Sequence, residues 1–359
     1  MIKLTDISPI ILHQIADSIK SYNQFSGHNT LPELLQDDAG IPVYNLDDIE
    51  KGLLYKDQNH FVICHIIESI HLLLIWKKNG MSMFPPNKKY LFLTNGQWNN
   101  GDFDIPLDYD VVHWPMFNLI FHASYNNHPA TKEFWYDRTY DFDGIKDGTF
   151  IGLFGSEKPF RDRLVKKIME MENDLGNFTL RYKGNDYKML DNLTDILPKV
   201  IPENGYVRGT AFNGLGLQMI SPSDLYKRFR FNLVVESNAY SVDEFHPTEK
   251  ICKPLVVGMP FVVYGSYRFL HNLRELGFQT YRNLWSEEYD EIQDCDKRIE
   301  SLLQTCKDLV RFDWQKNRSE LIEIAWNNSN ALRNLQKMVK RDLENFIQKV
   351  QQGMMTNGH

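Results

Sequence analysis

The stretch KRFRFNLVVESNAYSVDEFHPTEKICKPLVVGMPFVVYG, residues 227–265, decides the fold. Its apolar run Phe231–Val235 is typical of a buried strand. A helix is expected over residues 247–258, and the apolar run of residues 260–265 is typical of the next strand. A strand, a helix and a strand in this order favour a parallel sheet covered by helices. The sequence therefore predicts an α/β fold.

The same alternation continues on both sides of this stretch. Residues 149–154 form a strand pattern, and a glycine turn at residues 155–156 separates it from a helix pattern at residues 161–173. On the other side, residues 267–276 are expected to form a helix that Gly277 closes. We therefore expect a parallel sheet with helices on both faces.

The N-terminal third shows a similar but less regular pattern. The apolar positions of residues 59–78 suit a buried helix, and residues 90–94 and 109–114 suit two strands. Residues 1–57 show no clear pattern. A helix followed by two strands predicts a further α/β layer.

The length limits the number of domains. At roughly 150 residues per domain, 359 residues correspond to about two domains. We expect an N-terminal α/β lobe over residues 1–145, a second α/β lobe over residues 146–312 and a helical tail over residues 313–359.

The composition is that of a globular protein: 42% of the residues are hydrophobic and 24% are charged, which excludes disordered and collagen-like chains. Four scattered cysteines are too few for a disulfide framework, so we expect reduced thiols and a cytoplasmic location. No signal peptide is expected, because the start of the sequence lacks a basic region followed by a sustained apolar stretch. No membrane span is expected, because no apolar run reaches about 20 residues. The net charge of −7 argues against a surface made wholly for nucleic acid.

Polar side chains follow the strand at residues 231–235 and open the helix after it. Ligands of open α/β sheets bind beyond the carboxyl ends of the strands, and a helix N-terminus suits a phosphate. Lys250 adds a cation, and Glu236 or Glu249 can accept hydrogen bonds from ribose or sugar hydroxyls. The alternative is structural: Thr248 caps the helix and Glu249 favours its dipole. The residues expected in this nucleotide or nucleotide-sugar site are Glu236, Ser237, Asn238, Thr248, Glu249 and Lys250.

The order of these features resembles the donor-binding motif of the α1,3-fucosyltransferase family and its virus-encoded relatives. The shared features are basic residues at the start of the stretch, F-x-x-x-L-x-x-E ending at Glu236, T-E-K at residues 248–250 and G-x-P-x-x-x-x-G at residues 258–265. The resemblance implies a GT-B fold of two Rossmann-like lobes and inverting, metal-independent sugar transfer. It also implies that Glu236, Glu249 and Lys250 contact a nucleotide sugar.

The resemblance extends to residues 155–161, which are similar to the first strand and turn of the family's donor lobe. There an arginine reaches the pyrophosphate, and Arg161 is the matching residue. The planar fork of arginine can bind phosphate oxygens in pairs. The alternative is an exposed arginine in a first helical turn. The sequence departs from the family in having Ser237 and Asn238 in the reverse of the usual order, which leaves the identity of the sugar open.

A general base is less clear. Gln97 stands where the family has a glutamate, and an amide cannot take a proton from an acceptor hydroxyl. Asp102 and Asp104, in an expected loop, and Glu68, in the expected helix of residues 59–78, are the candidates. Each of them can equally be structural.

Two further expectations concern charge and metals. Arg161 and Lys250 are expected to share one crevice with three more basic residues, Lys227, Arg228 and Arg230. His65, Glu68 and His71 recur at intervals of three, but on a helix they diverge, so we expect no metal site and no cofactor besides the nucleotide sugar.

The acceptor stays open at this point. The resemblance to the family implies a glycan hydroxyl as the acceptor. The resemblance to its virus-encoded relatives allows a hydroxymethyl pyrimidine in DNA as the acceptor. A DNA acceptor predicts steep salt dependence of binding, and a glycan does not. Because of Gln97, a third alternative is a degenerate module that binds a nucleotide sugar without transferring it.

Overall fold

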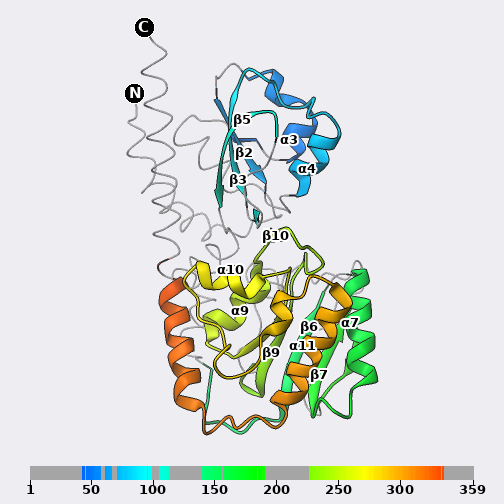
Figure 1. Ribbon diagram of the computed structural model, residues 1–359, viewed down its shortest axis with the longest axis vertical. Helices are drawn as coiled ribbons and strands as arrows, with labels where there is room; N and C mark the ends of the chain where they lie inside the picture. The colour runs from blue at the N-terminus through cyan, green and yellow to red at the C-terminus, as the bar shows by residue number, and fades with distance from the viewer. Residues whose placement is uncertain are drawn as a thin grey trace, which may run out of the picture. The chain divides into compact units, whose positions relative to one another are not determined.

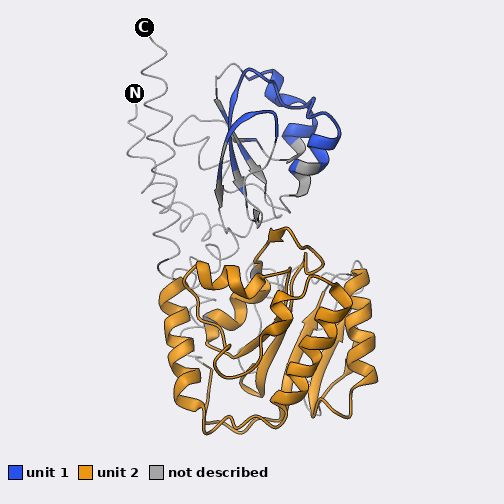
Figure 2. Ribbon diagram, viewed as in Figure 1, with its two compact units in different colours: residues 1–127, 333–359 blue, residues 128–332 orange. Residues whose placement is uncertain are grey.

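The structure is a computed structural model, and it describes residues 43–44, 46–57, 61–66, 71–94, 96–98, 105–113, 140–155, 157–183, 185–190, 226–332 and 334. The chain divides into two compact units (Figure 2). Unit 1 consists of residues 1–127 and 333–359, and unit 2 consists of residues 128–332. The expected boundaries after residues 145 and 312 stay predictions.

Unit 1 contains a parallel sheet with the strand order β1-β2-β3-β5. Neighbours in the sheet follow one another along the chain, so right-handed connections place the intervening helices α3 and α4 on one face, as Figure 1 shows. The described elements of this unit are β1 Val43–Tyr44, α3 Leu46–Glu50, η3 Leu53–Tyr55, β2 Phe61–Ile66, α4 His71–Lys78, β3 Lys89–Thr94, β4 Gln97–Trp98 and β5 Asp108–His113.

Aromatic side chains fill the core beneath these helices. The ring of Phe84 lies 5.2 Å from that of Trp76, 5.4 Å from that of Tyr90 and 5.8 Å from that of Phe92. All four side chains are buried. These contacts join α4 to β3 and fix the face of the sheet that α4 covers.

The expected helix over residues 59–78 is wrong in its first part. Residues 61–66 form strand β2, and only His71–Lys78 is described as helix. The run FVICHI is short and rich in β-branched residues, and an apolar run of this length does not distinguish a buried strand from a buried helix. Residues 61–66 form a strand because they pair with β1 on one side and β3 on the other.

Unit 2 contains a five-stranded sheet with the order β11-β9-β6-β7-β8. All neighbouring pairs are parallel except β7 and β8, which form an antiparallel pair at one edge. The described strands are β6 Gly148–Phe154, β7 Phe178–Tyr182, β8 Asn185–Lys188, β9 Phe229–Val235, β10 Glu244–Phe245 and β11 Phe261–Tyr264. The described helices are α7 Pro159–Glu170, α9 Glu249–Val257, α10 Phe269–Glu275, η5 Glu288–Glu291 and α11 Cys295–Leu309, and residues 318–332 are also helical.

The strand order of unit 2 reverses between β6 and β9. From β6 the chain passes through α7 to β7 on one side, and β9 then lies on the other side of β6. Right-handed connections therefore place α7 and α9 on opposite faces of the sheet. Helix α11 lies beside α7 (Figure 1), where Arg163 pairs with Asp296 at 3.0 Å. The carboxyl ends of β6 and β9 form the switch point at which open α/β sheets bind ligands.

The α/β class and the parallel sheet are confirmed. The strands expected at residues 149–154, 231–235 and 260–265 correspond to β6, β9 and β11. The helices expected at residues 161–173, 247–258 and 267–276 correspond to α7, α9 and α10, and the strands expected at residues 90–94 and 109–114 correspond to β3 and β5. Gly258 and Gly277 end α9 and α10 with φ of 73° and 90°, a conformation that favours glycine.

Candidate functional site

The candidate site lies at the carboxyl edge of the unit 2 sheet, at the switch point between β6 and β9. Strand β9 ends at Val235 and is followed directly by Glu236. Helix α9 begins at Glu249 and α7 begins at Pro159. The two helices approach this edge from opposite faces of the sheet, so the polar groups that follow the strands meet there.

The carboxylate of Glu236 is bound by the first turn of α9. It accepts hydrogen bonds from the backbone N–H of Thr248 at 3.2 Å and of Ile251 at 3.3 Å, and from the hydroxyl of Thr248 at 2.5 Å. The Glu236 residue is only 1% exposed. A carboxylate in this position compensates the positive end of the helix dipole. In the described contacts, the carboxylate of Glu236 therefore binds the first turn of α9.

Thr248 is the N-cap of α9, as the structural alternative expected. Its backbone is extended, with φ of −119°, and its hydroxyl oxygen accepts from the backbone N–H of Lys250 at 3.3 Å. An N-cap of this kind satisfies one of the N–H groups that have no partner within the helix. Thr248 thus joins Glu236 to the beginning of α9.

Lys250 is the half-buried cation of the site. Its ammonium group donates to the hydroxyl of Ser237 at 3.3 Å and to that of Thr248 at 3.2 Å. The neighbouring Asn238 donates from its amide to the buried carboxylate of Glu244 at 3.0 Å. The structure therefore brings together Lys250, Ser237 and Thr248 as expected, and it places Asn238 in the same loop.

Arg161 is buried, so the alternative of an exposed arginine is wrong. The residue is 1% exposed, and its Nη2 donates to the backbone carbonyls of Val235 and Glu236, each at 3.2 Å. Arginine can bridge several acceptors because its planar fork carries five N–H donors. Arg161 thus links the first turn of α7 to the end of β9 and sets the geometry of the edge.

A second buried arginine, Arg298, was missed from the sequence. Its guanidinium donates to the carbonyls of Ala239 at 3.0 Å, Gly265 at 2.8 Å and Gln293 at 3.0 Å. Burial lowers the pKa of Arg298. A signal was available, because Arg298 precedes the buried Leu302 by one helical turn and so falls on the apolar face of α11.

Three expected basic residues lie away from this edge. Lys227 and Arg228 precede β9 and Arg230 is its second residue, whereas the candidate site is at the other end of the strand. A strand of seven residues spans roughly 20 Å, so these side chains do not join Arg161 and Lys250. The expectation was wrong because it grouped residues by nearness in sequence, and a strand separates its two ends.

Several predicted residues lie outside the described residues. These are the base candidates Glu68, Asp102 and Asp104 and the side chain of Glu249, and their roles stay predictions. His65 lies in strand β2 and His71 begins helix α4, so the helical spacing used to assess them with Glu68 does not apply.

Within the described parts of the chain, no three His, Cys, Asp or Glu side chains are placed to hold a metal ion together. In the same parts, no helix has both the length and the apolar character that crossing a membrane requires. Comparisons of the chain with protein-family models, curated proteins and solved structures find no match. The functional assignment therefore depends on the switch-point geometry and on the sequence motif.

Proposed function

We propose that the protein is a glycosyltransferase that transfers a sugar from a nucleotide diphosphate to an acceptor hydroxyl with inversion. In this proposal unit 2 is the donor lobe of a GT-B enzyme, and a glycan supplies the acceptor hydroxyl. The observation that carries the proposal is the position of Lys250 beside Ser237 at the β6–β9 switch point. Crevices at such points bind nucleotides in open α/β sheets.

The proposed reaction uses this cation directly. The acceptor oxygen bonds to the anomeric carbon, the bond from that carbon to the diphosphate oxygen breaks, and a base takes the hydroxyl proton. Negative charge grows on the leaving diphosphate, and the ammonium of Lys250 stabilises it. Ser237 and Asn238 offer hydroxyl and amide groups to the ribose or the sugar.

The buried groups support this site indirectly. Glu236 fixes the start of α9, and with it the backbone that carries Lys250. Arg161 fixes the end of β9, from which Ser237 projects. Both contacts keep the cation and the hydroxyl group in a set geometry, and preorganised charge of this kind is more effective than mobile charge.

A binding module without transferase activity is the second candidate. It is favoured by Gln97, which lies in strand β4 at the place where the resembled family has a glutamate. The two candidates share the donor site and differ in turnover. Hydrolysis of the bound nucleotide sugar supports the transferase, and binding without hydrolysis or transfer supports the module.

A thermal-shift screen tests the shared prediction. GDP-, UDP- and dTDP-sugars are compared with CMP-sugars, which carry a single phosphate. A ligand at 100 times its Kd stabilises the folded state by about 2.7 kcal/mol, which raises Tm by several degrees. We expect at least one nucleotide diphosphate sugar to raise Tm, and no rise with any donor contradicts the proposal.

A further inference from the structure

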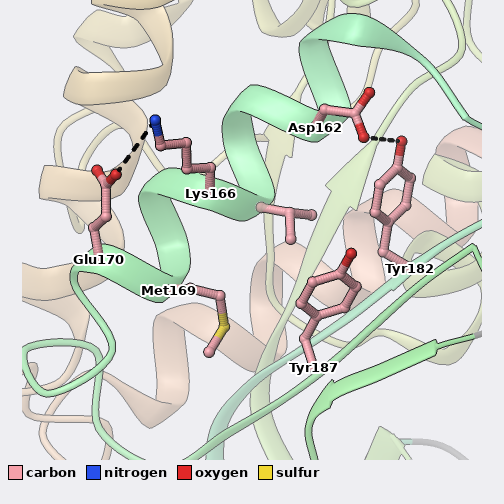
Figure 3. Close-up of a pocket in the computed structure, with 7 residues that line it drawn as sticks. Asp162, Lys166, Met169, Glu170, Tyr182 and Tyr187 are labelled. Atoms are coloured by element: carbon pink, nitrogen blue, oxygen red, sulfur yellow. Dashed lines mark hydrogen bonds and ion pairs between the residues drawn. The ribbon is translucent and has the colours of Figure 1, made fainter.

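A pocket of about 420 Å³ lies between helix α7 and the strands β7 and β8 (Figure 3). Its apolar wall is formed by Val165, Met169, Tyr182 and Tyr187, and its polar rim by Asp162, Lys166 and Glu170. This volume is within the range of small-molecule sites. Neither the sequence motif nor the proposed transfer reaction uses any of these seven residues.

The pocket and the candidate donor site are on different sides of α7. Arg161 and Asp162 are consecutive, yet Arg161 reaches the end of β9 and Asp162 accepts a hydrogen bond from the hydroxyl of Tyr182 on β7 at 3.0 Å. Successive residues of a helix point about 100° apart, so the two sites use different sides of one helix. A ligand can therefore occupy the pocket without entering the candidate donor site.

Two aromatic rings form one wall. The ring centroids of Tyr182 and Tyr187 are 6.3 Å apart and the rings are inclined by 36° (Figure 3). Tyr187 is 44% exposed, so a large part of this side chain is available to a ligand. Val165 and Met169 of α7 also line the pocket and complete an apolar surface. A ligand of this pocket therefore needs an apolar face.

Three charged side chains form the rim. Asp162, Lys166 and Glu170 are exposed and follow one another at intervals of four along α7, so they lie along one side of the helix. The ammonium of Lys166 is 3.9 Å from the carboxylate of Glu170. The rim thus alternates acceptor, donor and acceptor. Lys183 also pairs with Asp162 at 3.2 Å, so two carboxylates meet two ammonium groups and neither charge dominates. A ligand of this pocket needs groups that both donate and accept hydrogen bonds.

We infer that this pocket binds a neutral saccharide. A pyranose ring has an apolar face of C–H groups that packs on an aromatic ring, and a rim of hydroxyls that both donate and accept. The two carboxylates of the rim disfavour an anionic ligand, and Lys166 disfavours a cationic ligand. The inclined rings do not form the parallel slot that a nucleobase needs for stacking on both sides. This inference does not depend on the proposed transferase activity.

The test measures the affinity of free glucose, galactose, mannose, fucose and N-acetylglucosamine for the full chain by NMR titration. We expect at least one of them to bind, and Tyr187→Ala to weaken that binding about tenfold, the loss of one aromatic contact. Tyr187→Phe keeps the ring and should keep most of the affinity. The matched control is Trp326→Ala, which removes another exposed aromatic side chain of unit 2 outside the pocket and should leave the affinity unchanged.

Three results would overturn the inference. The first is that none of the five sugars binds the wild-type chain. The second is an equal loss of affinity in Tyr187→Ala and Trp326→Ala, which indicates unspecific contact with exposed rings. The third is a loss in Lys250→Ala without a loss in Tyr187→Ala, which places the free sugar at the switch point and leaves the proposed donor site standing.

Discussion

At the scale of single residues, Glu236 and Thr248 fix the beginning of α9. Glu236 accepts from two backbone N–H groups and one hydroxyl, although it is separated from that helix turn by a loop of 11 residues. The sequence indicated a cap at Thr248 as the structural alternative to a binding role, because a cap and its helix are adjacent in sequence. It did not predict the contact of Glu236 with the first turn of α9, because local sequence patterns do not determine the path of a loop.

Removing the Glu236 charge should therefore destabilise unit 2. Glu236→Gln removes the negative charge and replaces one acceptor oxygen by an NH₂ group, which would face the N–H groups of α9. We therefore expect the free energy of unfolding to fall by about 2 kcal/mol. Thr248→Ala should cost about 1 kcal/mol. Urea denaturation followed by circular dichroism measures both changes.

The matched control for this prediction is Glu275→Gln, which removes an exposed carboxylate from the end of α10. Surface substitutions of this kind change stability by no more than about 0.5 kcal/mol. Equal effects of Glu236→Gln and Glu275→Gln would show that the contacts of Glu236 contribute nothing to the fold.

At the scale of elements, η5 is attached to α10 through two buried carboxylates. Asp290 accepts from the backbone N–H groups of Leu270 at 2.8 Å and His271 at 2.9 Å, and so caps α10 from outside that helix. Glu287 accepts from Arg274 at 3.0 Å and from the backbone of Tyr281 at 2.7 Å. These contacts hold η5 and the residue before it against α10 and the segment that follows α10.

The two carboxylates predict a pH dependence of stability. Burial raises the pKa of Glu287 to about 7 and that of Asp290 to about 6. The folded chain therefore keeps protons that the unfolded chain has already released. The free energy of unfolding should fall as pH rises from about 4.5 to about 7, by roughly 1.4 kcal/mol for each unit by which folding raises a pKa, and then level off.

Urea denaturation at a series of pH values between about 4.5 and 8 measures this slope. Glu287→Gln cannot titrate at this position and should reduce the slope to the contribution of Asp290, whereas Glu288→Gln removes the adjacent exposed carboxylate and should leave the slope unchanged. A wild-type stability that rises over this range would contradict the assignment, because it requires carboxylates whose pKa is lowered on folding.

The elements also show where sequence patterns succeed. β9, α9 and β11 were predicted closely, because apolar runs, a threonine cap and a glycine stop all agree. The pair β7 and β8 was not predicted. β8 has the sequence NDYK, and its residues are exposed or half-buried, so it shows none of the apolar pattern on which strand prediction depends.

At the scale of the whole molecule, each unit contains a sheet of mainly parallel strands, as the alternation of strands and helices predicted. Strand order was not predictable from local patterns, and it is the order β9-β6-β7 that creates the switch point. The sequence correctly predicted that Lys250 lies at the end of β9 beside Ser237. It misplaced Lys227, Arg228 and Arg230, because the run of residues 227–250 contains a complete strand between its basic ends.

The central claim is that the switch point of unit 2 binds a nucleoside diphosphate through Lys250. Isothermal titration of the full chain with GDP and UDP measures it most directly, with Lys250→Ala as the variant. The control is Lys307→Ala, which removes a lysine of α11 whose exposed ion pair with Asp174 contributes little.

A charge-assisted contact contributes about 1.5–3 kcal/mol, so we predict that Lys250→Ala weakens binding about 10- to 100-fold and that Lys307→Ala leaves it unchanged. Equal affinity of Lys250→Ala and the wild-type chain, or no binding of either nucleotide by the wild-type chain, would contradict the claim.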